Sequence, residues 1–302
     1  MAGRTEIEWS DYSWNPVRGC SRTSRGCERC YAERFASRLS RTSYAGLVHR
    51  TTNGWRWTGK VAAAWDSVKE PLKWPPRGDT RARVFTDSMS DFFHENAPMD
   101  VVAAAWKVMR EADWHDFLIL TKRPENIESR LPDDWGAGYP NVWIGVSAED
   151  QENADARIPV LIGVKARVKF VSAEPLLDRL DLSAYLGEID RGEEKKALHG
   201  IDWVVTGGES GPGARPTNIG WIRDIVRQCA EAGVPSFVKQ LGGNVFAPLP
   251  SPSTGALART SIGIEMKLKS RKGNVVEEWP QDLRVRQTPE PWLEAPAKKE
   301  AK

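Results

Sequence analysis

The stretch RVFTDSMSDFFHENAPMDVVAAAWKVMREADWHDFLILT, residues 83–121, contains the pattern that decides the fold. It opens with an apolar run at 83–86, continues with a helical apolar face at 100–111, and ends with a second apolar run at 117–121. Short continuous apolar runs that alternate with amphipathic helices indicate parallel strands covered on both faces. The stretch therefore predicts a strand–helix–strand unit of a parallel α/β protein.

The same alternation continues along most of the chain. Further strands are predicted at 142–146, 168–171, 203–206 and 236–239, with one more at 6–10, and further helices at 150–162 and 219–232. This pattern predicts an α/β protein with a complete or partial parallel (β/α) barrel, and a doubly wound open sheet is the alternative. We expect a barrel domain at 1–245, which includes a Trp-rich insertion at 41–82, and a loop-rich C-terminal extension at 246–302 with a disordered end.

The composition is that of a soluble globular protein. The chain has 302 residues, of which 40% are hydrophobic and 28% charged, with a net charge of +2. This length is enough to bury a core without disulfides. No apolar run approaches the roughly 20 residues of a membrane-spanning helix, and the first residues lack the apolar core of a secretory signal. We therefore expect a cytoplasmic protein.

The small net charge hides an uneven distribution. Residues 1–83 contain 16 Lys and Arg against 8 Asp and Glu, whereas the rest of the chain contains 27 against 33. Three of the four cysteines lie in the basic first part. Clustered thiols in a chain without an export signal favour metal binding over disulfides.

The three cysteines lie in WNPVRGCSRTSRGCERCYAERFASRL, residues 14–39, with Cys20, Cys27 and Cys30 in the spacing C-x6-C-x2-C. The motif follows a predicted strand and enters a helical pattern from about residue 28, so it lies at the active-site end of a barrel. Three thiolates without a nearby fourth suit a [4Fe-4S] cluster, because one of its four irons can stay free. There are two alternatives to the cluster. One is a structural zinc site with His49 as fourth ligand, and the other is a loop that binds no metal. Cys229 is predicted to be a packed core thiol.

The chain resembles the radical S-adenosylmethionine superfamily, and more closely the phage-associated three-cysteine-motif family. The resemblance covers roughly residues 6–243 and rests on the blocks WNPVRGC, CERCYAERFA, FTDSMSDFFHE, LTKRPENI, IGVSAED, VSAEPLL, TGGESGPGARP and FVKQLGG. It implies a partial barrel, a [4Fe-4S] cluster on the three cysteines, and S-adenosylmethionine bound to the free iron. The common superfamily spacing is C-x3-C-x2-C with an aromatic residue before the third cysteine, whereas here the first gap is six and Arg29 takes that place.

Polar residues that follow the predicted strands are the candidate site residues, because barrel strand ends converge on one face. Paired glycines beside a carboxylate suit the amino or ribose groups of S-adenosylmethionine, basic groups suit an anionic substrate, and acid–base groups suit proton transfer. The candidate cofactor-binding residues are Ser147, Glu174, Gly207, Gly208 and Glu209. The candidate catalytic residues are Asp91, His94 and Lys239, and the candidate substrate-binding residues are Lys122, Arg123 and Gln240.

The insertion has a composition that suits the binding of nucleic acid. Within residues 50–77, basic residues alternate with Trp55, Trp57, Trp65 and Trp74, which combines phosphate neutralisation with base stacking. The tryptophans could equally anchor the insertion to the barrel.

Three functions follow as hypotheses. The first is a radical S-adenosylmethionine enzyme that generates a 5′-deoxyadenosyl radical on an unknown, phage-related substrate. The second is a zinc-stabilised nucleic-acid-binding accessory protein. The third is a metal-independent barrel hydrolase that uses Glu174 and Glu209 as a carboxylate pair.

Overall fold

The computed structural model describes residues 2–189, 198–248 and 263–289. Most of the predicted loop at 247–263 and the predicted disordered end lie outside these residues. Contacts divide the chain into two compact units. Unit 1 contains the described residues up to Val146 together with Gly163–Lys169, and unit 2 contains those within Ser147–Ile162 and Phe170–Pro289. In the described residues, no helix combines the length and the apolar character that crossing a membrane requires.

Unit 1 is built on a mainly parallel sheet. Its strands are β1 (Ala2–Arg4), β2 (Tyr12–Trp14), β7 (Ala82–Thr86), β8 (His115–Thr121) and β9 (Val142–Ser147). β1 pairs with β2 in antiparallel orientation, and the pairs β2–β7, β7–β8 and β8–β9 are parallel. The helix α2 (Met99–Glu111) connects β7 to β8 and buries its apolar face, including Val102, Trp106 and Met109.

Unit 2 continues the same alternation. The strands β10 (Val168–Ala173), β13 (Trp203–Gly207) and β15 (Ser236–Gln240) pair in parallel, in that order. Its helices are α3 (Gln151–Gly163) and α4 (Ile219–Glu231). Short strands complete the unit, namely β11 (Glu188–Ile189), β12 (Leu198–His199), β14 (Thr217–Asn218), β16 (Val245–Ala247) and β17 (Ile264–Met266).

The sequence-based fold class is confirmed. Within each unit the parallel strands pair in chain order, β2–β7–β8–β9 in unit 1 and β10–β13–β15 in unit 2. A doubly wound sheet reverses its strand order, whereas neither unit does, so the fold is an α/β fold of the partial (β/α) barrel type. All six apolar runs and all three helices predicted after residue 83 are present, with shifts of at most two residues at their ends.

Two predictions about the N-terminal part are wrong. Residues 6–10 do not form a strand, because the Ser10 N–H donates to Ile7 O at 3.0 Å and closes a turn there. The strand is instead β2, which pairs with β7. The helix α1 (Tyr31–Arg38) begins three residues later than expected, after a 3-10 turn, η1 (Arg25–Cys27), so that Cys30 precedes the helix.

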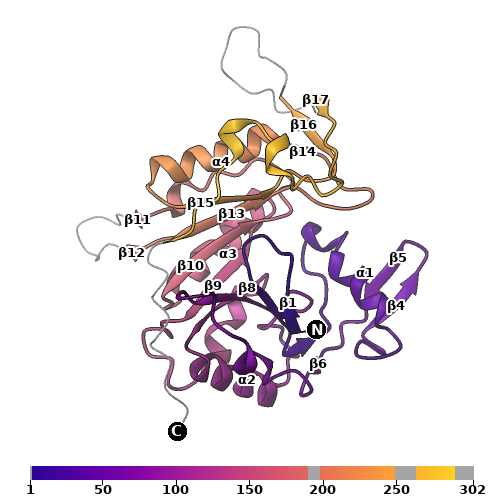
Figure 1. The fold of residues 1–302 in the computed structure, drawn as a ribbon, viewed down its shortest axis with the longest axis vertical. Helices are drawn as coiled ribbons and strands as arrows, with labels where there is room; N and C mark the ends of the chain where they lie inside the picture. The colour runs from indigo at the N-terminus through magenta and orange to yellow at the C-terminus, as the bar shows by residue number, and fades with distance from the viewer. Residues whose placement is uncertain (1, 190–197, 249–262, 290–302) are drawn as a thin grey trace. The chain divides into compact units, whose positions relative to one another are not determined.

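The insertion folds around α1 within unit 1. β4 (Val48–Thr51) and β5 (Gly54–Trp57) form an antiparallel hairpin beside α1 (Figure 1), and β6 (Ala62–Ala63) pairs with β3 (Val17–Arg18). Glu33, on α1, is 1% exposed. Its carboxylate accepts hydrogen bonds from the backbone N–H of Trp57 at 3.1 Å and from Arg22 at 2.7 Å. One buried carboxylate thus ties α1, the cysteine loop and the hairpin together.

β8 begins with a buried histidine, His115, that makes the free energy of unfolding depend on pH. His115 is fully buried, and burial lowers its pKa to about 4. Its Nε2 lies 3.1 Å from Pro71 O, a distance that suits donation by the neutral ring. The unfolded chain binds a proton near pH 6.5 that the folded chain does not. The contribution of His115 is therefore complete above about pH 6.5 and is lost as the pH falls toward 4.

We expect His115→Gln to flatten this dependence, because glutamine can donate to Pro71 O but does not titrate. Between pH 7.5 and 4.5 the unfolding free energy of the wild type should fall by up to about 3 kcal/mol more than that of the variant, measured by urea unfolding. The neighbouring Asp116, whose pKa burial raises to about 7, has the opposite dependence but is common to both proteins. Parallel pH profiles for the two proteins would contradict the assignment.

Candidate metal and cofactor site

The cysteine loop lies between β2 and α1, with β3 and η1 on the way, and it follows the carboxyl end of a parallel strand. That strand is β2, not the expected strand at 6–10. Gly19, next to the first cysteine, has a φ of +89°. A Cβ there would lie 2.3 Å from Lys60 O, so the residue must be glycine for the insertion backbone to pass. The insertion therefore helps to shape the loop that holds the cysteines.

The three thiols of the loop are half-buried and electrostatically coupled. Burial raises the pKa of Cys20, and the charges of Cys27 and Cys30 raise it further. Burial also raises the pKa of Cys30. At Cys27 burial opposes ionisation, but Lys122 and contacts with Thr23 and Ser24 outweigh it and lower the pKa. The loop therefore brings three thiols together, and Cys27 ionises most readily.

The loop does not preassemble a site for a single metal ion. Among the described residues, no three His, Cys, Asp or Glu side chains are grouped closely enough to hold one ion. His49, the predicted fourth zinc ligand, is exposed on β4 opposite Arg56 in the hairpin. A cluster distributes its thiolates over separate irons, so it requires a wider spacing than one tetrahedral zinc.

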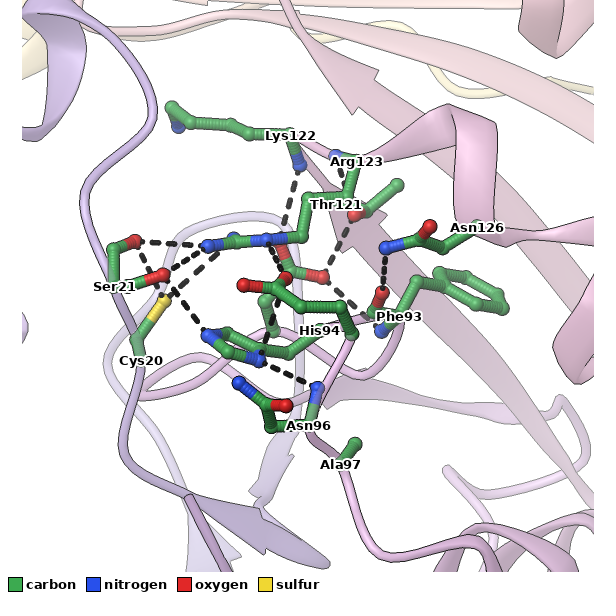
Figure 2. A network of polar contacts seen from close by, with 12 residues as sticks. Cys20, Ser21, Phe93, His94, Asn96, Ala97, Thr121, Lys122, Arg123 and Asn126 are labelled. Carbon is green, nitrogen blue, oxygen red and sulfur yellow. Dashed lines mark hydrogen bonds and ion pairs between the residues drawn. The ribbon is translucent and has the colours of Figure 1, made fainter. Parts of the chain in front are cut away.

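A buried arginine from the end of β8 reaches the cysteine loop. Figure 2 shows the Arg123 guanidinium directed toward Cys20 and Ser21. Its Nη1 donates to Cys20 Sγ at 3.9 Å and to an Asp91 carboxylate oxygen at 3.0 Å, while Nη2 donates to Ser21 Oγ at 2.6 Å and to Ser21 O at 3.1 Å. Nε donates to Glu95 at 2.8 Å. Arg123 thus joins the ends of β7 and β8 to the loop after β2.

Asp91 and His94 hold this network in place. Asp91 is 4% exposed and accepts hydrogen bonds from Thr121 Oγ1 at 2.7 Å and from Arg123. The Asn96 N–H donates to His94 Nδ1 at 3.1 Å, so the proton of the neutral ring is on Nε2, which lies 3.0 Å from Ser21 Oγ (Figure 2). Burial, and secondly Arg123, lowers the pKa of His94. Both side chains therefore position Arg123 and Ser21, and their catalytic role stays a prediction.

The predicted cofactor-binding residues lie in unit 2, at the ends of β9, β10 and β13. Glu174 pairs with Lys239, whose Nζ lies 3.2 Å from Oε1. Glu209 accepts three hydrogen bonds from Arg215 at 2.6–3.1 Å, so both its oxygens are occupied. Ser147 is buried at the end of β9, and its carbonyl accepts a hydrogen bond from Arg157. Unit 2 thus brings Glu174 and Lys239 together and commits Glu209 to a structural ion pair.

The paired glycines are required by packing. A Cβ on Gly208 would lie 2.2 Å from Leu241 O and 2.6 Å from Thr217 Oγ1, and a Cβ on Gly207 would lie 2.8 Å from Glu174 Oε1. The Gln240 side chain donates to Gly208 O at 2.8 Å, while its Oε1 is buried without a hydrogen bond. Glu174 Oε1 makes no hydrogen bond but lies 3.2 Å from Lys239 Nζ in their ion pair. Gln240 Oε1 therefore has capacity for a donor, and Glu174 Oε1 shares its charge with Lys239.

Sequence reasoning missed several residues that shape these sites. Ser21, Glu95 and Glu33 are loop or helix residues whose roles depend on contacts between segments far apart in the chain. The pairing of Glu209 with Arg215 could have been predicted from the sequence, because the two residues lie six apart in one glycine-rich loop.

The chain belongs to the family DUF5131, proteins of unknown function, because the family model matches residues 4–280. No curated protein and no solved structure matches the chain.

We expect Asp91→Asn to destabilise unit 1 by about 3 kcal/mol in urea unfolding, because it removes the buried carboxylate that pairs with the buried Arg123 guanidinium and leaves the half-exposed Glu95 as the charged partner. The Cys20 thiol should also react faster with a thiol reagent, since the loop loses an anchor. Asp134→Asn is the matched control, because both Asp134 and its partner Arg110 are exposed and the change should have little effect on stability. Equal effects of the two substitutions would contradict a special role for the buried pair.

Gly208→Ala should destabilise unit 2 by at least about 3 kcal/mol whether or not any ligand is bound, because the added methyl group meets the backbone of Leu241. Gly163→Ala, where a Cβ meets nothing within 4 Å, should leave the thermal midpoint within a few degrees of the wild type. If Gly208→Ala had wild-type stability and only lost ligand binding, the glycine would serve the ligand instead.

Proposed function

We propose that this DUF5131 protein is a radical S-adenosylmethionine-like iron–sulfur enzyme, with a cluster held by Cys20, Cys27 and Cys30. The observation that carries the proposal is the placement of three cysteines on one loop that follows a parallel strand, with a buried arginine directed at the first of them. The phage association of the substrate stays a prediction.

The residues around the loop fit such a cluster. Three thiolates leave one iron of a four-iron cluster free for a ligand. Thiolates that are ionised in a partly buried site need nearby positive charge, and Arg123, Lys122 and Arg22 lie in the electrostatic surroundings of the cysteines. Hydrogen bonds to cluster sulfurs raise the reduction potential, so Arg123 would tune the potential through Cys20.

When bound, a four-iron cluster and S-adenosylmethionine supply one-electron cleavage of the sulfonium bond, which yields a 5′-deoxyadenosyl radical that takes a hydrogen atom from substrate. The chain supplies position and protection for this chemistry. An apolar group that includes Ala36, Tyr44 and Met89 packs against Cys20 and Cys30 and keeps water from that side. Lys122, whose charge acts on Cys27, is the group we assign to an anionic part of the substrate, with Arg123 holding the loop.

Unit 2, taken by itself, has polar groups that suit an amine or hydroxyl ligand. Gln240 Oε1 near Gly207 is buried without a hydrogen bond, and Glu174 Oε1 is shared with the Lys239 ammonium, so an ammonium or ribose hydroxyl would bind at Gln240 Oε1 and at the second lone pair of Glu174 Oε1. We assign this role to Glu174 and Gln240 in preference to Glu209, because Arg215 occupies both oxygens of Glu209. Lys239 then positions Glu174 through their ion pair.

The zinc-stabilised alternative uses the same cysteines but needs a fourth ligand, and in the described residues His49 is not grouped with them. Metal identity therefore separates the two functions.

Anaerobic reconstitution with iron and sulfide should give a brown protein with about four irons and four sulfides per chain. After dithionite reduction it should release 5′-deoxyadenosine from S-adenosylmethionine. The triple variant of Cys20, Cys27 and Cys30 to Ala should lose the iron and the nucleoside, since the ligands are gone. Cys229→Ala is the matched control and should keep both, because that thiol is fully buried on α4. A wild-type protein that retains zinc, takes up no iron and releases no nucleoside would overturn the proposal.

A further inference from the structure

The exposed face of α1 has an unusual composition. Tyr31, Arg34, Phe35 and Arg38 are all exposed and follow the spacing i, i+3, i+4, i+7, so they form one stripe along the helix. The opposite face, with Ala32, Glu33 and Ala36, is buried. A surface helix normally presents polar residues to water, whereas this stripe alternates aromatic rings with arginines. We call these four residues the α1 stripe.

The two rings form a continuous aromatic surface. Tyr31 is 45% and Phe35 43% exposed, and their ring centroids lie 6.3 Å apart at an interplanar angle of 81°. The Arg38 guanidinium lies 5.1 Å from the Phe35 centroid. The Tyr31 hydroxyl donates to Ser88 O, which fixes the first ring. Single exposed apolar residues are common on protein surfaces, but a fixed pair flanked by arginines is a stacking surface.

The charge around the stripe is strongly positive. Residues 18–60 contain ten Lys and Arg but only two acidic residues. Of these two, Glu33 is buried and engaged by Arg22 and Arg56, which leaves Glu28 as the exposed acid. The exposed basic residues of this segment are Arg25, Arg29, Arg34, Arg38, Arg41, Arg50 and Lys60. The surface therefore complements a polyanion.

The tryptophans of the insertion are mostly engaged elsewhere. Trp57 is 8% exposed in the group packed on α1, and Trp74 stacks on Tyr12 with centroids 4.6 Å apart at 8°. Trp55 is half-buried, and Trp65 alone of the four is exposed. These positions favour anchoring for three of them. The accessible rings that lie among the arginines belong to α1.

We propose that the α1 stripe and its neighbouring arginines bind single-stranded nucleic acid. Tyr31 and Phe35 stack on bases, and the arginines neutralise the phosphates. A duplex fits less well, because its bases are already stacked and hidden from the rings. The binding surface uses none of the three cysteines, so it can be tested on protein without the cluster.

Fluorescence anisotropy with the full-length protein and labelled oligonucleotides of about 15 nucleotides tests the proposal. A poly-dT strand, the matching RNA strand and a duplex of the same length serve as probes, at several salt concentrations. Phe35→Ala should weaken binding to the single strands about tenfold, and Phe35→Trp should restore it, since stacking depends on the ring. Arg34→Glu with Arg38→Glu should lower the slope of log affinity against log salt by about 1.4. DNA and RNA that bind equally would identify the phosphate and base as the recognised groups, and a preference for RNA would add the 2′-hydroxyl.

Two controls are matched to these variants. Trp65→Ala removes an exposed ring outside the stripe, and Lys165→Glu reverses an exposed charge away from residues 18–60, so both should leave affinity unchanged. Circular dichroism of every variant checks that the fold is intact. Loss of binding in Trp65→Ala but not in Phe35→Ala would overturn the assignment to α1, and so would tighter binding to the duplex than to the single strand. Wild-type affinity in Phe35→Ala, whatever its thermal stability, would overturn the proposal as well.

The outcome is separable from that for the proposed function. Chelator-treated, iron-free protein should bind the single strands as the reconstituted protein does. Binding without 5′-deoxyadenosine release would support the surface and contradict the enzyme, whereas nucleoside release without binding would do the reverse.

Discussion

The buried ion pair between Arg123 and Asp91 is the interaction on which the arrangement of unit 1 depends. It joins the residues that follow β7 and β8, and the remaining donors of the same guanidinium reach Ser21, Glu95 and Cys20. Only arginine offers five donors in a fixed plane, so no other side chain could make these contacts together. A buried charge pair of this kind adds little net stability over an apolar core, but it permits few alternative geometries. The surroundings of Cys20 are therefore set by residues that follow β7 and β8, of which Arg123 lies 103 residues further along the chain.

Unit 2 shows how one motif can satisfy packing and still leave room for a ligand. The glycines at 207 and 208 are explained by the backbone of β15 and the residue after it, with no ligand required. Close packing nevertheless leaves Gln240 Oε1 buried without a donor, while Glu174 Oε1 has the Lys239 ammonium at 3.2 Å as its partner. Buried acceptors of this kind are uncommon because water cannot compensate them. Their presence at a strand end, where parallel sheets bind ligands, is the reason to assign them to a cofactor.

The basic N-terminal part combines two roles that the sequence does not separate. Some of its arginines face inward, as Arg22 does toward Glu33 and Arg18 toward Asp66. Others, such as Arg34 and Arg38, face water beside exposed rings. The inward groups shape the cysteine loop, and the outward groups create the positive surface. The positive charge of this part of the chain is thus divided between arginines that pair with carboxylates near the cysteine loop and arginines that face water.

The sequence by itself determined the strand and helix positions, the α/β class and the cysteine loop as the candidate metal site, because periodicity and motif spacing are local properties. It failed at residues 6–10, where a turn that ends on Ser10 replaced the expected strand. Nor does the sequence show which aromatic rings are accessible: Trp57 and Trp74 are engaged in packing, whereas Trp65, Tyr31 and Phe35 are exposed. Only the tertiary structure decided which carboxylates are already paired, as Glu209 is, and which polar residues hold Arg123. Burial and pairing depend on contacts between segments that are distant in the chain, and no local pattern encodes them.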